Sequence, residues 1–323
     1  MAVSGTVPTE LGDKKIRDLL MQYAVPAIIA MTASSLYNMV DSIFIGHIKD
    51  VGSYAISGLA VTFPLMNIST ALGTLVGVGA STILSMLLGQ RNYQAANKVI
   101  INEVMLNVII GTLYTVITLV FLDPILMFFG ASANTLPYAR DYMVIILIGN
   151  VITHLYFGLN NIIRASGNPK LAMALTIFTV VSNTILDPIF IFWLDMGIKG
   201  AALATVICQM LALVYTVRYF LSGKNYLRLP RRMSEYRLDW RIAKDSLTVG
   251  MGPFLMNSAA CIVTMFINQQ LSKYGGDLAI GAYGIVNRFT FLFIMVNMGL
   301  NQGMQPIAGY NFGAREYSRV KQV

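Results

Sequence analysis

The sequence predicts an all-α membrane protein with eight transmembrane helices, and three observations carry the prediction. Hydrophobic residues make up 56% of the chain and charged residues only 12%, and the mean hydropathy is +0.64, unlike a soluble domain. The apolar residues gather in long stretches, and basic residues gather in alternate loops. We expect a six-helix N-terminal lobe at 1–222, a basic cytoplasmic linker at 223–244, and the first two helices of a second, incomplete lobe at 245–323.

Each predicted span is an apolar stretch of roughly 20 residues or more, long enough to cross a bilayer as a helix. In chain order the stretches are 19–45, 56–88, 99–122, 136–163, 171–193, 199–221, 247–272 and 278–312. The second and the eighth exceed the length that a bilayer requires. Each contains several glycines and a proline, Pro64 in one and Pro306 in the other. We therefore expect both to be bent helices that extend into the cytoplasm.

The distribution of Lys and Arg predicts the orientation in the membrane. Of the 23 basic residues, eighteen fall in loops, span ends or tails on one side, and only Arg288 falls away from the ends of a span. The four on the other side are Lys49, Arg140, Lys199 and Lys273. Cytoplasmic loops carry the excess of basic residues, so both termini are expected in the cytoplasm of a multi-pass protein of the cell (inner) membrane. The net charge of +8 then reflects topology, and we expect no nucleic-acid partner.

The chain also contains an internal repeat. Pro26 recurs 227 residues later as Pro253, and Asp41 is matched at the same spacing by Asn268. The segment Gly89-Gln-Arg-Asn-Tyr returns 224 residues later as Gly313-Ala-Arg-Glu-Tyr. Tandem hydrophobic units are typical of secondary transporters, which bind their substrate between the two units. Because the second copy lacks the acid, we expect a coupling cation to bind only in the first lobe.

Two of the acidic residues within predicted spans, Asp41 and Asp187, are candidates for function, since polar groups there are costly and are retained mainly for function. Asp41 lies towards the outer end of the first span, with Tyr37 and Asn38 about one turn before it. Asp187 lies in the outer half of the fifth span, with Asn183 on the same helical face. Two carboxylates with amide and hydroxyl oxygens suit a hard cation or a shared proton. The alternative is that both are helix-end acids that reach water, and that the amides only join helices.

Other polar residues within spans are candidates for weaker reasons. Arg288 is either a partner for an acid or a residue that lines a cavity. The two histidines and two cysteines are too isolated to form a metal centre or a nucleophile–base pair, so we expect neither enzyme activity nor a cofactor beyond a coupling ion. Additional oxygen ligands and hydrogen-bond partners could come from Thr205, Tyr142, Asn160 and Asn161.

Several motifs resemble the multidrug and toxic compound extrusion (MATE) family, and most closely its prokaryotic DinF-like branch. These are Tyr37-Asn-Met-Val-Asp41, the Gly89-Gln-Arg-Asn-Tyr loop, Arg164-Ala-Ser-Gly-Asn-Pro169 and Asn183-x3-Asp187-Pro188. The resemblance implies a twelve-helix antiporter whose two six-helix lobes face a central cavity. It also implies export of amphipathic, mostly cationic drugs or toxins in exchange for Na⁺ or H⁺. The last four helices of the family are absent, so the chain resembles a truncated member, which we expect to be monomeric.

The same resemblance assigns roles to individual residues. It implies a cation site for Na⁺ formed by Asp41, Asn183, Asp187 and Thr205. It places Tyr142, Asn160 and Asn161 where related proteins line the cavity. To these cavity residues we add Tyr37, Asn38 and Arg288.

Two other functions remain open. A lipid-linked precursor flippase of the same structural superfamily would place several basic residues in its cavity, whereas Arg288 is the only basic residue away from the ends of a predicted span. The other alternative is a membrane fragment that does not transport.

Overall fold

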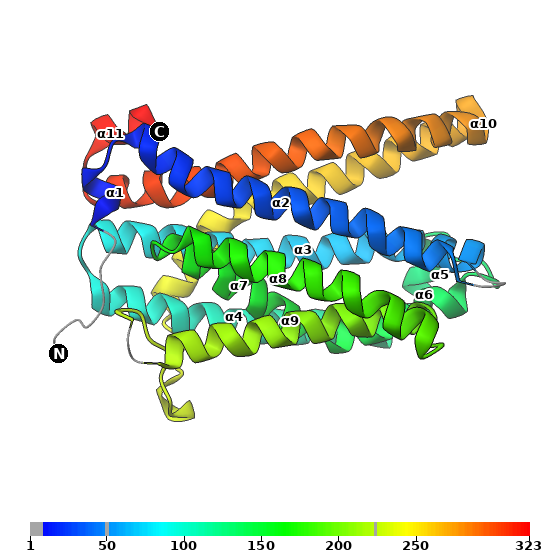
Figure 1. Ribbon diagram of the computed structural model, residues 1–323, viewed down its shortest axis with the longest axis horizontal. Helices are drawn as coiled ribbons and strands as arrows, with labels where there is room; N and C mark the ends of the chain where they lie inside the picture. Colours follow the sequence, from blue (N-terminus) through cyan, green and yellow to red (C-terminus); the bar gives the residue numbers. More distant parts are fainter. Residues whose placement is uncertain (1–8, 49–51, 223–224) are drawn as a thin grey trace.

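A computed structural model of the chain describes residues 9–48, 52–222 and 225–323. Side chains are described in these ranges except at 53 and 233, and between 264 and 292 only at 266, 267, 270, 274 and 290. All regular structure in these ranges is helical, which confirms the predicted fold class. The long helices lie along the long axis of the molecule, and α1 (Glu10–Asp13) lies at the same end as the C-terminus (Figure 1).

Most predicted spans correspond to one long helix each. The first three are α2 (Ile16–Gly46), α3 (Gly52–Gly89) and α4 (Tyr93–Val120). The fifth is α8 (Pro169–Pro188), which a π-helical turn, η1 (Ile189–Trp193), continues, and the sixth is α9 (Ile198–Leu221). Within the described residues, six helices are long and apolar enough to cross a membrane, or seven if the bent pair described next is one span. The short helices are α5 (Leu122–Phe128), η2 (Met233–Glu235) and α11 (Tyr317–Gln322).

The fourth predicted span is bent in its middle. Sequence alone predicts one helix at 136–163, but α6 (Leu136–Ile148) and α7 (Asn150–Ala165) meet at an angle of 54°. Gly149 lies at the bend, where an added Cβ would lie 2.5 Å from the side chain of Val206 on α9. The bend therefore lets α9 approach the backbone between α6 and α7.

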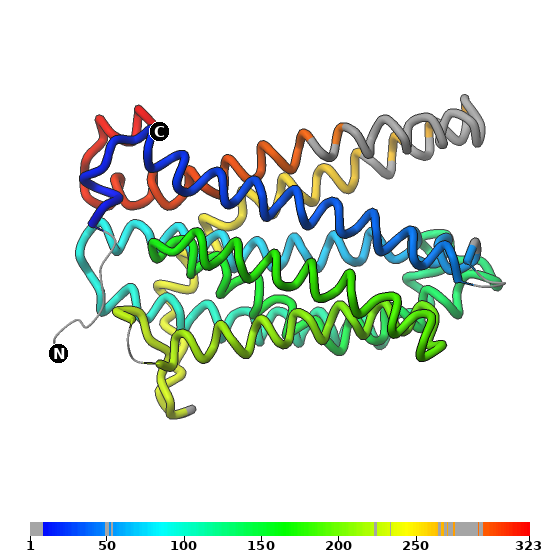
Figure 2. The backbone as a smooth tube through the Cα atoms, viewed as in Figure 1, coloured from blue at the N-terminus to red at the C-terminus, as the bar shows by residue number. Residues whose placement is uncertain are grey.

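The last long helix, α10 (Trp240–Gly313), contains the seventh and the eighth predicted spans. Its two ends, 240–263 (arm 1) and 293–313 (arm 2), run in opposite directions (Figures 1 and 2). Both arms pack against the first lobe through glycines. A Cβ on Gly250 of arm 1 would overlap the carbonyl of Leu75 on α3, and one on Gly303 of arm 2 would overlap Ala24 on α2. The backbones are therefore in direct contact, as small residues allow in membrane helix pairs.

The basic linker is docked against the helical bundle. The Tyr226 hydroxyl donates to the carbonyl oxygen of Ser166 at 2.7 Å, and the backbone N–H of Asp239 donates to the side chain of Asn102 at 2.9 Å. Helix α10 begins at Trp240, four residues before the predicted end of the linker. The segment from 225 to 239 thus packs against the first lobe before arm 1 begins.

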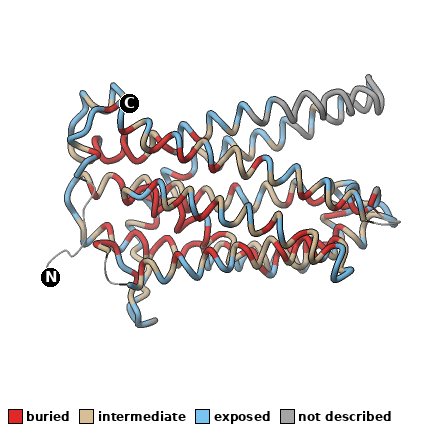
Figure 3. The backbone as a smooth tube through the Cα atoms, viewed as in Figure 1, coloured by how far each residue is buried: buried red, intermediate tan, exposed pale blue. Residues whose placement is uncertain are grey.

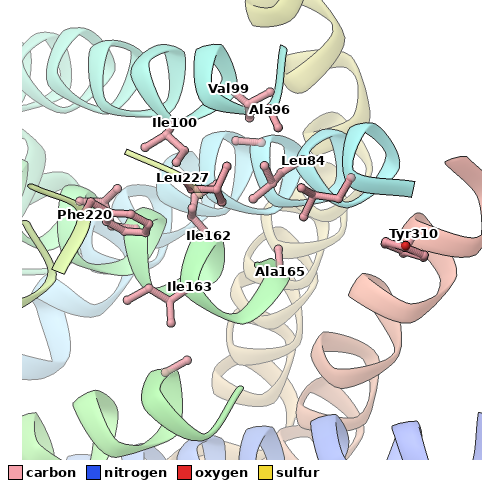
Figure 4. Close-up of a cluster of buried hydrophobic side chains, with 14 of the residues drawn as sticks. Leu84, Ala96, Val99, Ile100, Ile162, Ile163, Ala165, Phe220, Leu227 and Tyr310 are labelled. Atoms are coloured by element: carbon pink, nitrogen blue, oxygen red, sulfur yellow. The ribbon is translucent and has the colours of Figure 1, made fainter. Parts of the chain in front are cut away.

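The main apolar core lies among α3, α4, α7, α9 and the docked linker. Its fully buried side chains include Leu84, Ile100, Ile162, Phe220 and Leu227 (Figure 4). Buried positions follow the inner faces of the bundle, and exposed positions follow its outer faces (Figure 3). The outer faces carry large apolar side chains, as a lipid-facing surface requires. Examples on α4 are Leu113, Val116, Ile117 and Val120.

Candidate functional site

Two acids from different helices meet in the interior of the first lobe. Asp41 lies on α2 and Asp187 on α8, and these helices pack along each other. Their carboxyl groups lie close enough to interact electrostatically. Both side chains are buried, Asp41 with 6% and Asp187 with 0% of its surface exposed. Two carboxyl groups this close do not both stay ionised unless a cation or a proton lies between them.

A chain of hydrogen bonds connects this pair to a third helix. The Asn183 amide donates to Oδ1 of Asp187 at 2.8 Å, one turn along α8. The Thr205 hydroxyl on α9 lies 3.5 Å from Oδ1 of Asn183 and 3.0 Å from the hydroxyl of Tyr37 on α2. The five residues form what we call the Asp41–Asp187 site. The structure thus brings together all four residues that the sequence assigned to a cation site.

The oxygens of the site fit a hard cation. Oδ1 of Asp41 and Oδ2 of Asp187 are buried and have no hydrogen-bond partner among the described protein atoms. A buried polar atom left in this way costs free energy unless an ion or a proton satisfies it. Carboxylate, amide and hydroxyl oxygens are the ligands that hard cations prefer. The donor set therefore suits Na⁺ or a proton.

Tyr142 and Asn38 differ in their relation to this site. Tyr142 on α6 is buried and lies close enough to Asp41, Asp187 and Tyr37 to interact with them electrostatically. Asn38 is exposed, because it follows Tyr37 directly and successive helical residues point in different directions. Of the predicted cavity residues, Tyr37 and Tyr142 thus lie at the acid pair and Asn38 lies on another face of α2.

Asn160 and Asn161 belong to a separate polar cluster. The Asn160 amide donates to the carbonyl oxygen of Ala172, near the start of α8, at 3.0 Å. Ala172 lies ~22 Å along α8 from Asp187, at 1.5 Å per residue. The structure therefore does not bring these two asparagines to the acid pair. Arg288, the remaining predicted cavity residue, lies outside the described side chains.

The centre of this second cluster is Arg164, which sequence reasoning counted among the charges of a cytoplasmic loop. Its guanidinium is buried in the last turn of α7 and donates to Oδ1 of Asn161 at 3.3 Å and of Asn160 at 3.4 Å. It also donates to the Gln302 side chain on arm 2. The signal was present in the sequence, since residues three and four before Arg164 share its helical face and both are asparagines.

Comparisons with known proteins identify the family of the chain. The MatE family model matches residues 26–189 and 253–323. Multidrug export protein MepA of Staphylococcus aureus (strain MSSA476) is 31% identical over 304 residues, which cover 94% of this chain and 66% of that protein. The chain thus spans slightly less than two thirds of the length of that curated relative.

Solved structures share the fold. One, described as the outward-facing conformation of a multidrug resistance MATE family transporter of the MOP superfamily, has a TM-score of 0.90 and 24% identity, with 98% of this chain and 70% of that chain covered. Another, described only as "protein A", has a TM-score of 0.86 and 37% identity, with 96% and 69% covered. The family model covers more than half of the sequence, and the helices superpose on those of MATE structures. This multi-pass membrane protein therefore belongs to the MatE family.

Proposed function

We propose that the chain acts in multidrug efflux, as an antiporter that exports amphipathic, mostly cationic compounds in exchange for Na⁺ or H⁺. The observation that carries the proposal is the buried Asp41–Asp187 pair, with Asn183 and Thr205 supplying further oxygens. Membership of the MatE family and similarity to a multidrug export protein support the same function. These relatives are transporters, so we propose no enzyme activity.

In this proposal, the coupling ion acts by changing the charge of the pair. Without Na⁺, one of the two carboxyl groups holds a proton and the other stays ionised. Binding of Na⁺, or of a second proton, neutralises the remaining charge. A neutral pair attracts a cationic compound less strongly, so ion entry favours release of the compound. Asp41 and Asp187 lie on different helices, so neutralisation also changes how α2 packs against α8.

Alternating access would come from the two arms of α10 moving against the first lobe. At the end of the molecule that carries α1 and the C-terminus, side chains of arm 2 bind the first lobe. Gln305 donates to the carbonyl oxygen of Val78 at 3.0 Å, and Asn311 donates to that of Leu11 at 3.0 Å. Opening this end requires these contacts, and the one between Arg164 and Gln302, to break. The proposal therefore assigns the present arrangement to a state closed at this end.

The test is substitution of the acids in a host that lacks its own drug pumps. Asp41→Asn and Asp187→Asn should each reduce dye efflux roughly tenfold or more under Na⁺ and proton gradients applied separately. The double variant should lose no more than either single one, because both remove the same coupled site. Asp141→Asn is the control, since Asp141 forms an exposed ion pair with Lys199 at 3.2 Å, outside the site.

Ion binding to the purified chain gives a second readout. Calorimetry should show Na⁺ or proton uptake that Asp41→Asn abolishes and Asp141→Asn retains. Efflux by the double variant at the wild-type rate, with unchanged ion dependence, would contradict the proposal.

A further inference from the structure

A third buried acid lies outside the Asp41–Asp187 site. Glu103 on α4 has 0% of its surface exposed. Its Oε1 accepts a hydrogen bond from the amide of Asn107, one turn along the same helix, and Asn107 is equally buried. Oε2 of Glu103 and Oδ1 of Asn107 have no hydrogen-bond partner among the described protein atoms. Glu103 is the fifth residue of the predicted span 99–122, and helix α7 covers it.

A glycine of the neighbouring helix makes room for this carboxyl group. Gly158 on α7 faces Glu103, and a Cβ there would overlap Oε1 of Glu103 and lie 2.6 Å from the Asn107 amide nitrogen. Gly77 of α3 approaches the same point, since a Cβ on it would lie 3.3 Å from Cα of Gly158. The carboxyl group therefore lies directly against helix backbone, in a space that residues with side chains would fill.

Further polar residues lie one turn away on α7, and we call this row of polar residues between α4 and α7 the polar seam. His154 is buried, and its Nε2 lies 3.0 Å from the hydroxyl of Ser69 on α3. Ser69 donates to Oδ1 of Asn150 at 2.6 Å. The other ring nitrogen of His154, Nδ1, is buried without a partner among the described atoms and faces α4 beside Gly111. Three unpartnered buried atoms, from Glu103, Asn107 and His154, thus lie along one interface between α4 and α7.

The described structure provides no cationic partner for Glu103. Between Gly52 and Gly89, α3 contains no Asp, Glu, Lys, Arg or His. On α4, Lys98 pairs with Asp239 at 3.4 Å on the surface. On α7, the Arg164 guanidinium binds side-chain amides. The charged residues at the start of arm 1, which packs against α4 through Ala243, are exposed: Arg241, Lys244 and Asp245.

We propose that Glu103 is a second proton-binding site of the first lobe, independent of the Asp41–Asp187 site. An isolated carboxylate is costly to bury, whereas a neutral carboxylic acid accepts the one N–H that Asn107 offers and leaves no charge in the seam. When α4 separates from α7 and water enters, Glu103–COOH becomes Glu103–COO⁻ and releases one H⁺ to that water. Reclosure of the seam requires the proton to return. Asn107 is the positioning residue, because it holds the carboxyl group against Gly158.

The test is infrared spectroscopy of the purified chain in lipid nanodiscs, titrated with pH. The C=O stretch of a protonated carboxyl group distinguishes it from a carboxylate. We expect the Asp41→Asn, Asp187→Asn double variant to retain one buried, protonated carboxyl band that exchanges slowly in D₂O. Adding Glu103→Gln should remove that band, and adding Glu235→Gln, at an exposed acid on η2, should not. Persistence of the band after Glu103→Gln, or its absence in the double variant, would overturn the proposal.

Asn107→Ala provides a second test in case the Glu103→Gln variant does not fold. It retains the acid and removes the hydrogen bond that Asn107 donates to it, so the band should persist and shift to higher frequency. An unshifted band would show that the signal comes from another group and would overturn the proposal.

The inference deepens the proposed function by adding a second site for the proton, but its spectroscopic test does not require efflux. If the acid-pair variants transport normally while the Glu103 band behaves as expected, the proposed function fails and this site stands. If efflux depends on the acid pair and the band is absent, the proposed function stands and the Glu103 site fails.

Discussion

At the residue scale, Thr205 connects three helices through one hydroxyl group. Its Oγ1 lies 3.0 Å from the Tyr37 hydroxyl of α2, 3.5 Å from Asn183 of α8 and 3.1 Å from the carbonyl oxygen of Ala201 on its own helix. The single proton of the hydroxyl can point to either acceptor, while its lone pairs accept from Tyr37. Thr205 can therefore change hydrogen-bond partner when an ion enters, without moving its backbone.

Thr205→Val tests this role, because valine retains the shape and removes the oxygen. The lost ligand and the unpaired Tyr37 hydroxyl should together cost about 1–3 kcal/mol, which is roughly a tenfold loss of Na⁺ affinity in calorimetry. Thr205→Ser should restore affinity. Thr184→Val is the matched control on α8, since the Thr184 hydroxyl binds only the carbonyl of Val180 in its own helix. Equal affinity in Thr205→Val and Thr184→Val would show that the hydroxyl is not a ligand.

At the element scale, glycines determine how closely the arms of α10 approach the first lobe. Arm 1 packs on α3 through a reciprocal pair, since Gly250 lies against Leu75 and Gly79 against Ser246. Arm 2 packs on α2 through its own glycines, and Gly299 lies against Ile28. In each case the nearest atoms belong to backbone, which cannot rotate away as a side chain can. Any larger residue must therefore separate the helices.

Gly250→Ala and Gly252→Ala should change stability in opposite directions. At Gly250 the methyl group would overlap the Leu75 carbonyl, so we expect a loss of about 1–3 kcal/mol from overpacking. At Gly252, two residues on in the same helix, no atom lies within 4 Å of an added Cβ. There alanine should stabilise the helix by up to about 1 kcal/mol, because glycine loses more conformational entropy on folding. Melting temperatures of the purified variants measure the difference, and equal shifts would contradict this packing.

At the scale of the whole molecule, charged residues gather at the two ends of the bundle. Arg140 pairs with Asp123 at 3.4 Å and Lys199 with Asp141 at 3.2 Å at one end. Lys14 pairs with Glu10 on α1 near the C-terminus at the other end. The surface between the ends carries apolar side chains, as a bilayer requires. These exposed ion pairs contribute little to stability, but their positions indicate where the two membrane surfaces lie.

Cysteine labelling tests the proposed orientation. In a background without Cys208 and Cys261, cysteine at Arg231 or Lys321 should be protected from an impermeant thiol reagent in intact cells. Cysteine at Arg140 or Lys199 should react, because the positive-inside rule places these sites outside. The same assignment places Lys49 and Lys273 outside; Lys49 lies outside the described residues, and the side chain of Lys273 is not described. Labelling of position 231 in intact cells, together with protection of positions 140 and 199, would reverse the topology.

The spans and the acid pair could be predicted from the sequence because their signals are local. A run of apolar residues specifies a spanning helix whatever its neighbours are, and α2, α3, α4, α8 and α9 begin and end within six residues of the predicted limits. An acidic residue within such a run is easily recognised, because placing its carboxyl group in the membrane costs free energy. The sequence therefore indicates Asp41 and Asp187 as candidates whether or not they are in contact.

The tertiary structure alone decided which polar residues are buried together, since burial depends on the helices that pack across each face. Glu103 lies only ten residues into α4, and it is buried because Gly158 of α7 lets a second backbone cover it. In the sequence Arg164 resembles a charged loop residue, but in the fold it binds Gln302 of arm 2, 138 residues away. The bend at Gly149 likewise depends on Val206 of α9. A hydropathy profile describes each helix separately, whereas these features arise from contacts between helices that are distant in the chain.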